Sequence, residues 1–489
     1  MRRTPRRLIG TFIAVAALLA VIPATASANL SLTGSHAEPA DLAAGAHSPF
    51  KVHVAFGSED VKDLTISLPP GEVGNPQATP LCDPSALPTC PANTEVGTVT
   101  TSVTIQGLLP QTLNGTVFNL VPQPGEPARF GIVINALPVS LPAPLNGLFL
   151  PPTVIQSGAA LRQNDFGLDT VVQKIPNSAD LINIPPLPPV PIGIHINSMD
   201  LTLDGTAPGP PPSHFMRNPT SCTAHTVGFA GDSYSSATVV TADSPSFTPT
   251  NCAGLDFSPT LSASVGGPGQ TSVGSLTTAT TSINQDVDEA GLIKATVLVP
   301  SDLAPNVNLL GFRCAPANFL AGTCPTTSIV GTAVAASPLL SQPLVGNVLL
   351  VDNGGLLPDI GLDLQGQLHL LLRGALNADK SVVFNGLPDI PIARFQLAFS
   401  NPPGLLQVSR DLCAPPQPLF HADFTGYNGA QTSVDAPATV NGCGAGNNLS
   451  KCKKHKVKKK HKKRAAESKK KHKKKRSCKK KKRHKKHRK

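Results

Sequence analysis

Two nine-residue stretches, CPANTEVGT at residues 90–98 and CPTTSIVGT at residues 324–332, open with Cys-Pro and close with a Gly-Thr pair in register. The similarity extends in both directions from them. Upstream, Leu68-Pro69 parallels Val299-Pro300, and downstream LLPQTLNGTV (108–117) parallels LLSQPLVGNV (339–348). Further on, LPPVPI (187–192) parallels LPDIPI (387–392). Self-similarity of this extent indicates one structural module present twice.

Eight cysteines follow the same scheme in the two copies. They are Cys82, Cys90, Cys222 and Cys252 in the first copy, and Cys314, Cys324, Cys413 and Cys443 in the second. An even number of cysteines per module in an exported chain indicates disulfides. We expect the pairs Cys82–Cys90, Cys222–Cys252, Cys314–Cys324 and Cys413–Cys443, although four cysteines allow three connectivities. A structural zinc site, the rival interpretation, is disfavoured because neither copy has paired CxxC spacing.

The composition favours strands over helices, with 50 Pro, 41 Gly and only 15% charged residues. Val52, Val54 and Phe56 alternate with polar or small residues, as do Phe395, Leu397 and Phe399, and period two indicates half-buried antiparallel strands. We therefore predict an all-β protein with two tandem disulfide-containing, immunoglobulin-like β-sandwiches, at residues 29–256 and 257–445. A smaller subdomain around the later cysteine pair of each copy remains an alternative.

The N-terminus has the pattern of an export signal. Four arginines precede an apolar run from Leu8 to Ile22, and Ala26-Ser27-Ala28 follows as a small-residue cleavage site. Residues 1–28 are thus a predicted signal peptide. A membrane anchor is the alternative, but the run is short of the roughly 20 residues that a span needs.

The net charge of +12 divides sharply along the chain. Residues 451–489 hold 26 of the 42 Lys and Arg but only one of the 30 acids, Glu467, so this segment carries +25. With the four signal arginines also set aside, residues 29–450 have 12 basic and 29 acidic side chains and carry −17. The basic isoelectric point therefore describes the tail and not the body.

We predict that residues 446–489 form a disordered polybasic tail, because like charges repel and no core can form. Its partner would be a polyanion: an anionic envelope polymer, a membrane surface, the protein's own acidic body or, less favoured after export, nucleic acid. Cys452 and Cys478 stand outside the modular scheme. The residues proposed for polyanion binding are Lys453, Lys454, Lys458, Lys459, Lys460, Arg464, Lys469, Lys474, Arg476, Lys480, Arg483 and Arg488.

No motif of an enzyme accompanies the histidines and acids of the body, and we expect no catalytic residues, cofactor or metal. Gly231-Asp232-Ser233 faintly resembles a lipase block, but a turn is the better interpretation. Asp286, Asp288 and Glu289 could hold calcium, although a solvated hairpin turn explains them as well. Asp352, Asn353, Asp359 and Asp363 are explained by a tight turn at Gly354-Gly355. A glycan site is not indicated either, because Trp is absent and Tyr occurs twice.

The first copy contains the series LPPG (68–71), GNP (74–76), CP (90–91), VGT (96–98) and GEPARFG (125–131). This series, together with the Lys/His/Arg-rich C-terminus, resembles a group of uncharacterised secreted actinobacterial proteins with repeated β modules. The second copy departs from it, with Asn353-Gly354-Gly355-Leu356 in place of the Gly-Glu-Pro-Ala-Arg-Phe stretch. The resemblance implies the fold and export, and no activity.

These observations favour a non-catalytic structural or adhesion-type protein, secreted and associated with the cell surface, whose tail is an electrostatic tether. Two alternatives stay open: an extracellular hydrolase with a dispersed site, and a secreted nucleic-acid-binding protein acting through the tail. The sequence leaves the protein or glycan ligand of the β modules, the oligomeric state and any divergence between the copies undetermined.

Overall fold

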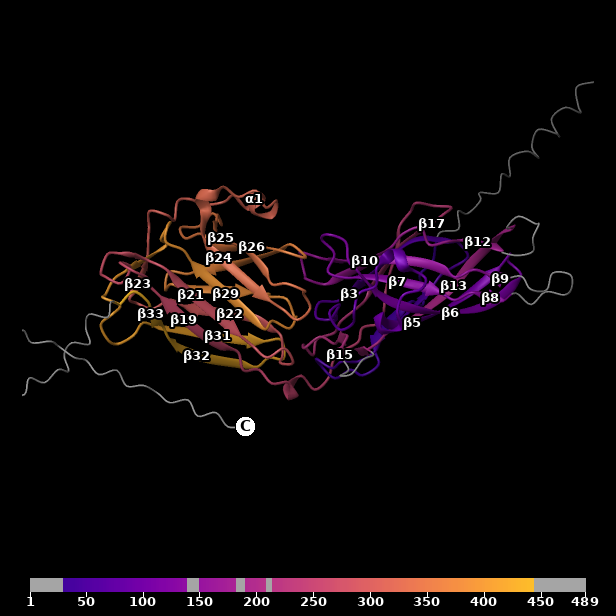
Figure 1. Ribbon diagram of the computed structural model, residues 1–489, viewed down its shortest axis with the longest axis horizontal. Coiled ribbons are helices and arrows are strands. Elements are labelled where there is room, and N and C mark those ends of the chain that lie inside the picture. Colours follow the sequence, from indigo (N-terminus) through magenta and orange to yellow (C-terminus); the bar gives the residue numbers. More distant parts are fainter. Residues whose placement is uncertain (1–29, 139–148, 182–189, 208–212, 444–489) are drawn as a thin grey trace, which may run out of the picture. The chain divides into compact units, whose positions relative to one another are not determined.

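The computed structural model describes residues 30–138, 149–181, 190–207 and 213–443 (Figure 1). The predicted signal peptide and polybasic tail lie outside these residues, as does the proline-rich stretch 182–189. Within them, the regular structure is mostly strand. The helical elements of these residues are α1 (Pro316–Leu320) and four 3₁₀ turns, η1 (Pro84–Ala86), η2 (Ala92–Thr94), η3 (Cys252–Gly254) and η4 (Thr326–Ser328). No helix of the described part is long and apolar enough to cross a bilayer.

The first repeat forms one antiparallel sheet. Its order is β1-β2-β13-β5-β6-β7-β10-β11-β3-β17-β18, and β12 pairs with β13 outside this path. The strands, in chain order, are β1 (His36–Pro39), β2 (Phe50–Ala55), β3 (Val61–Leu68), β5 (Glu95–Ile105), β6 (Leu109–Leu120), β7 (Arg129–Ile134), β10 (Thr153–Leu161), β11 (Leu168–Val172), β12 (Ser178–Leu181), β13 (Val190–Leu203), β17 (Gly228–Ser233) and β18 (Val240–Asp243).

The second repeat forms a sheet of the same design. Read from its end, the order is β33-β19-β21-β29-β24-β25-β26-β27-β28-β22-β31-β32. Its strands are β19 (Thr260–Val265), β21 (Ala279–Asn284), β22 (Leu292–Leu298), β24 (Ile329–Ala336), β25 (Leu344–Val351), β26 (Asp359–Gln365), β27 (Leu370–Leu376), β28 (Ser381–Asn385), β29 (Arg394–Phe399), β31 (Leu419–Gly426), β32 (Gln431–Pro437) and β33 (Thr439–Val440).

The two orders match strand for strand from β1/β19 to β18/β32, with β33 as an addition that pairs in parallel with β19. Short strands also form small sheets of two or three strands, separate from the two large ones. They are β4 (Val73–Gly74) with β16 (Met216–Arg217), β8 (Leu137–Pro138) with β9 (Phe149–Leu150), β14 (Thr206–Ala207) with β15 (Ser213–His214), and the group β20 (Leu276–Thr277), β30 (Leu406–Val408) and β23 (Leu303–Pro305). The prediction of an all-β protein with two tandem sandwiches is thus confirmed for the described residues.

Alternation along the strands builds one main core in each repeat. On β2, Phe50, Val52 and Val54 are buried while the residues between them are not. On β29, Leu397 and Phe399 are buried and Phe395 is half-buried. Each sheet folds over on itself, so side chains from its two halves share the core. Packing of this kind excludes water from the inner face of the sheet and supplies most of the stability.

Candidate functional site

The four disulfides are Cys82–Cys90, Cys222–Cys252, Cys314–Cys324 and Cys413–Cys443, the pairs that the spacing predicts. The first disulfide of each repeat lies at the same place in the fold. The backbone of Cys82 exchanges hydrogen bonds with Asn119 and Val121, and that of Cys314 does so with Leu350 and Asp352. Each of these bridges therefore attaches a loop to the end of the matching strand, β6 or β25.

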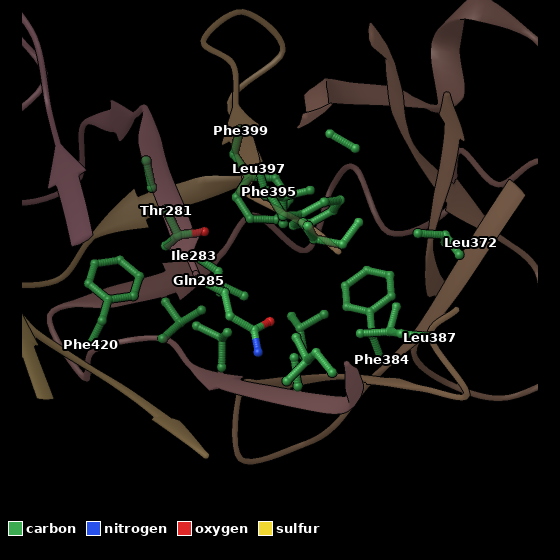
Figure 2. Close-up of a pocket in the computed structure, with 18 of the residues that line it drawn as sticks. Thr281, Ile283, Gln285, Leu372, Phe384, Leu387, Phe395, Leu397, Phe399 and Phe420 are labelled. Atoms are coloured by element: carbon green, nitrogen blue, oxygen red, sulfur yellow. The ribbon is translucent and has the colours of Figure 1, made fainter. Parts of the chain in front are cut away.

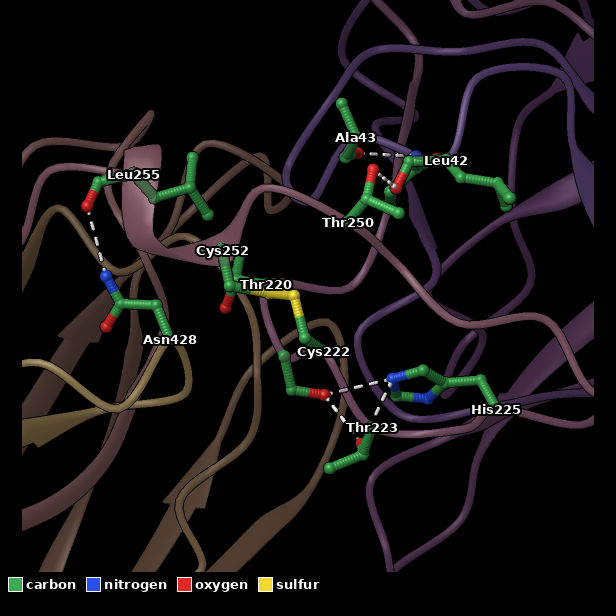
Figure 3. Close-up of a disulfide and its surroundings, with 12 residues drawn as sticks. Leu42, Ala43, Thr220, Cys222, Thr223, His225, Thr250, Cys252, Leu255 and Asn428 are labelled. Atoms are coloured by element: carbon green, nitrogen blue, oxygen red, sulfur yellow. Dashed lines mark hydrogen bonds between the residues drawn. A yellow bond between two sulfur atoms is a disulfide. The ribbon is translucent and has the colours of Figure 1, made fainter.

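The later bridge of each repeat closes a segment with a sequence separation of 30 that contains strands of the main sheet. These are β17 and β18 in the first repeat and β31, β32 and β33 in the second. A separate disulfide-closed subdomain, the alternative from the sequence, is therefore wrong, because these strands continue the large sheets. Figure 3 shows Cys222–Cys252 beside Leu255, whose carbonyl accepts a hydrogen bond from Asn428 at 3.0 Å.

The acids considered for calcium hold other partners. Glu289 accepts hydrogen bonds from the backbone and hydroxyl of Ser258, and Asp286 accepts one from the amide of Asp288 at 3.2 Å. The expected turn is present at these residues, but the hairpin is wrong, because β21 and β22 pair with other strands. Within the described ranges, no group of three His, Cys, Asp or Glu side chains is placed to bind a metal.

The acids near Gly354-Gly355 are likewise dispersed into separate pairs. Asp352 contacts Arg313 at 3.2 Å, Asp359 contacts Arg373 at 2.6 Å, and Asp363 contacts His369 at 2.8 Å. Asn353 donates from Nδ2 to Asp359 at 2.7 Å. Gly354 has a φ of +74°, as the expected tight turn requires.

Two groups of polar side chains have the residue types of a hydrolase site. Gly231-Asp232-Ser233, expected in a turn, instead ends strand β17, where Asp232 accepts a hydrogen bond from the amide of Asp63. Ser221, which precedes the disulfide-bonded Cys222, has its Oγ 2.9 Å from Nε2 of His225. Figure 3 shows the His225 ring near this disulfide. Burial lowers the pKa of His225. Ser221 is itself buried and also contacts Thr223, so a local hydrogen-bond network explains the pair.

A buried polar cluster surrounds Asp389 in the loop that precedes β29. The carboxylate accepts hydrogen bonds from the backbone N of Thr220 at 2.7 Å and from its Oγ1 at 2.6 Å. Burial raises the pKa of Asp389, and these hydrogen bonds oppose the shift. Burial, with the nearby Asp389 charge, raises the pKa of Tyr427 to about 12, and the Tyr427 hydroxyl donates to the carbonyl of Leu387. No feature of the local sequence indicates this cluster.

Glu72 is a second buried acid that the sequence analysis missed. Its side chain is fully buried, and neither carboxylate oxygen has a hydrogen-bond partner among the described residues. Burial raises its pKa well above the usual value. At the matching turn of the second repeat, the buried Leu303 stands at the position of Glu72, and the preceding Asp302 accepts two hydrogen bonds from the guanidinium of Arg410, at 2.9 and 3.0 Å.

An apolar cavity lies inside the second repeat (Figure 2). Its volume is about 90 Å³, and the side chains of Ile283, Phe384, Phe395 and Leu397 contribute to its wall. Gln285 lies just beyond β21 and brings an amide among these apolar groups. No sequence pattern predicts this cavity, because its lining residues come from strands that are distant in the sequence.

Comparisons with known proteins show no family. No family model matches the chain, and no curated protein matches it. A solved structure described as "Putative membrane anchored protein from Corynebacterium diphtheriae" is 10% identical over 83% of this chain and 91% of that chain, with a TM-score of 0.19. A similarity this low carries no argument about function, so function must be inferred from the chain itself.

Proposed function

We propose that this chain is an exported, non-catalytic envelope protein of the structural or adhesion type. In this proposal the two disulfide-stapled repeats form the body, and the polybasic tail attaches it to an anionic polymer or membrane surface. The observation that carries the proposal is the division of charge, −17 over residues 29–450 against +25 over residues 451–489.

The ion pairs of the body support this division of roles. Six of the twelve Lys and Arg of residues 29–450 form ion pairs with acids: Lys62, Arg129, Arg162, Arg313, Arg373 and Arg410. Half of the basic side chains of the body are therefore already neutralised by acids, and the body keeps an excess of acidic side chains. The body would therefore be repelled from an anionic surface, and attraction would come from the tail.

The disulfides support export. Bridges of this number are typical of oxidising compartments and rare in the cytosol. Each local bridge contributes on the order of 2 to 4 kcal/mol in the chain-entropy account. Near an anionic membrane, each Lys or Arg contributes about 1 kcal/mol within a screening length, so partial engagement of the tail would suffice for retention.

Cell fractionation tests the proposal with three forms of the full chain. The first has the natural tail, the second has the same tail residues in shuffled order, and the third has every tail Lys and Arg replaced by Gln. The natural and shuffled forms should remain with the cells and be released by high salt, and the Gln form should appear in the medium. Salt-resistant retention of the Gln form would refute the tether.

A binding assay separates the candidate polyanions. The intact protein is titrated with anionic vesicles, an anionic envelope polymer and duplex DNA, matched in charge density. A tether without sequence readout should bind all three with a similar dependence on salt. A marked preference for DNA would contradict the envelope role and support the nucleic-acid alternative.

A further inference from the structure

The cavity of the second repeat has a counterpart position in the first repeat, and the strand registers define it. Gly97 of β5 pairs with Leu203, which pairs with Phe50 of β2. Gly331 of β24 pairs with Phe399, which pairs with Ala279 of β21. Both glycines belong to the repeated Gly-Thr pair, so Ala279 occupies the position of Phe50.

Counting along the same strands gives the other correspondences. Thr281 occupies the position of Val52, and Gln285 that of Phe56. In the other half of the sheet, on β3 and β22, the Leu68/Val299 match places Ala295 at the position of Leu64. In the first repeat Phe50 and Leu64 are 0% and 1% exposed and pack in the core.

The second repeat therefore has small or polar side chains at four core positions that hold large apolar ones in the first. Its aromatic rings lie instead on β28 and β29, where Phe384, Phe395 and Phe399 line the cavity. The ring of Phe384 lies against Gly374, where an added Cβ would come within 2.9 Å of three ring atoms. Gly374 thus keeps this ring at the wall, so the space beside Ala279 and Ala295 stays open.

Gln285 gives the cavity its one amide. Its Nε2 donates to the carbonyl of Ala290 at 2.6 Å, which fixes the orientation of the amide. Oε1 is left as an acceptor that no described residue uses, and it can accept a hydrogen bond only from a ligand or water. Thr281, on the same side of β21, adds a hydroxyl to the wall. In the first repeat, the wall of a cavity of about 70 Å³ has Phe56 at the position of Gln285.

We infer that the second repeat binds a small aliphatic ligand with a hydroxyl group, whose hydrocarbon part occupies the cavity and whose hydroxyl donates to Oε1 of Gln285. The volume of about 90 Å³ limits the enclosed hydrocarbon to a few carbons, since a dry apolar cavity of roughly 150 Å³ is filled by a single benzene. The ligand could be a free alcohol or the hydroxylated end of a longer chain. This inference concerns the body and is independent of the tail.

A titration with 1-butanol and 1-chlorobutane tests this site, because the two probes have similar size and only the alcohol can donate. Methyl NMR signals of Ile283 and Leu397 in the intact oxidised protein report occupancy. We expect saturable shifts with 1-butanol and weaker binding of 1-chlorobutane. The variant Gln285→Leu should reduce the preference for the alcohol by about 3- to 10-fold, as expected for one hydrogen bond.

Filling the cavity should abolish the binding. Ala279→Phe and, as a smaller change, Ala295→Leu restore the residues of the first repeat and should weaken binding more than tenfold while unfolding stays cooperative. The control Thr153→Leu, in the wall of the first-repeat cavity, should leave binding unchanged. Shifts that do not saturate, or that persist in both filled variants, would overturn the site. Equal binding of both probes to the natural protein would overturn the role of Gln285.

Titrations with 1,2-hexanediol and 1-decanol distinguish a free alcohol from the hydroxylated end of a longer chain. Binding that persists with 1-decanol indicates the end of a chain entering through an open mouth, and loss of binding above six carbons indicates a closed site for a free alcohol. Either result supports the ligand class. Failure of the whole series would leave the tail tether untouched, because the fractionation experiment does not involve the cavity.

Discussion

Thr220 binds Asp389 twice, through its backbone N at 2.7 Å and its Oγ1 at 2.6 Å, although the two residues are 169 positions apart in the sequence. Thr220 Oγ1 also accepts a hydrogen bond from the amide of Gly291 at 2.9 Å. All three groups are buried. The hydroxyl of Thr220 therefore donates to the carboxylate of Asp389 and accepts from the amide of Gly291. Its removal would take one hydrogen bond from each of these buried groups.

The variant Thr220→Val keeps the shape of the side chain but removes the hydroxyl. We expect the free energy of unfolding to fall by about 1 to 3 kcal/mol, the cost of leaving buried polar groups unsatisfied. Urea titration followed by far-ultraviolet circular dichroism measures this change. Thr98→Val, at an exposed position of β5, is the matched control and should change stability by less than about 0.5 kcal/mol. Equal stability of the Thr220 variant and the natural protein would contradict this role.

Glu72 should destabilise the native state at neutral pH. Burial raises its pKa, so below the unfolded-state value both states are protonated and the side chain has no effect on stability. As the pH rises above that value, the unfolded chain ionises first, and each unit by which the native pKa is higher costs about 1.4 kcal/mol. We expect Glu72→Gln to be more stable than the natural protein at pH 7, with the difference vanishing near pH 4.

Asp302→Asn, in contrast, should lower the stability of the protein at pH 7. Asp302 is held by two hydrogen bonds from Arg410, and its replacement removes an ion pair from the matching turn of the second repeat. Chemical unfolding of both variants between pH 4 and 8 gives the comparison. A Glu72→Gln variant that is less stable than the natural protein at pH 7 would show that the carboxylate has a stabilising partner.

Patterns that repeat at short range predicted the fold well. The Cys-Pro and Gly-Thr pairs at 90–98 and 324–332 aligned the two modules, and alternation at Val52 and Val54 predicted the half-buried strand β2. Features that depend on distant pairing could not be predicted. Ala279 looks like an ordinary strand residue until its pairing with Phe399 shows that a phenylalanine occupies the same position in the first repeat. Glu72 follows a Pro-Pro-Gly turn, which by itself suggests exposure.

His47 provides an acid-sensitive position. Its ring stacks on His214 with centroids 3.9 Å apart, and burial, with smaller effects of His214 and Arg217, lowers its pKa. Because the native pKa is below the unfolded value of about 6.5, the stabilising contribution is present above that pH and is lost as the pH falls through the native pKa. His47→Gln should therefore lose less stability than the natural protein between pH 7 and 5.

His421 is the matched control, because a hydrogen bond to Asp435 raises its pKa. His421→Gln should lose the extra stability that the natural protein has at acid pH. The two variants should thus shift the pH dependence of the unfolding midpoint in opposite directions. Parallel curves for His47→Gln and the natural protein would contradict the assignment.

The two bridges of the first repeat should differ in their contribution to stability. Cys82–Cys90 closes a loop of 8 residues and Cys222–Cys252 one of 30, and the chain-entropy account gives the longer loop about 1 kcal/mol more. The longer bridge also closes the segment that supplies β17 and the edge strand β18 to the sheet, so its removal loosens the end of the sheet as well as one loop. We expect the double variant Cys222→Ser/Cys252→Ser to lower the free energy of unfolding more than Cys82→Ser/Cys90→Ser, in urea titrations without reductant.

The second repeat provides the same comparison, through Cys413→Ser/Cys443→Ser and Cys314→Ser/Cys324→Ser, with loops of 30 and 10 residues. The same order in both repeats is required, and a larger loss from the short bridges would mean that they stabilise the native packing of their loops rather than restrict the unfolded chain.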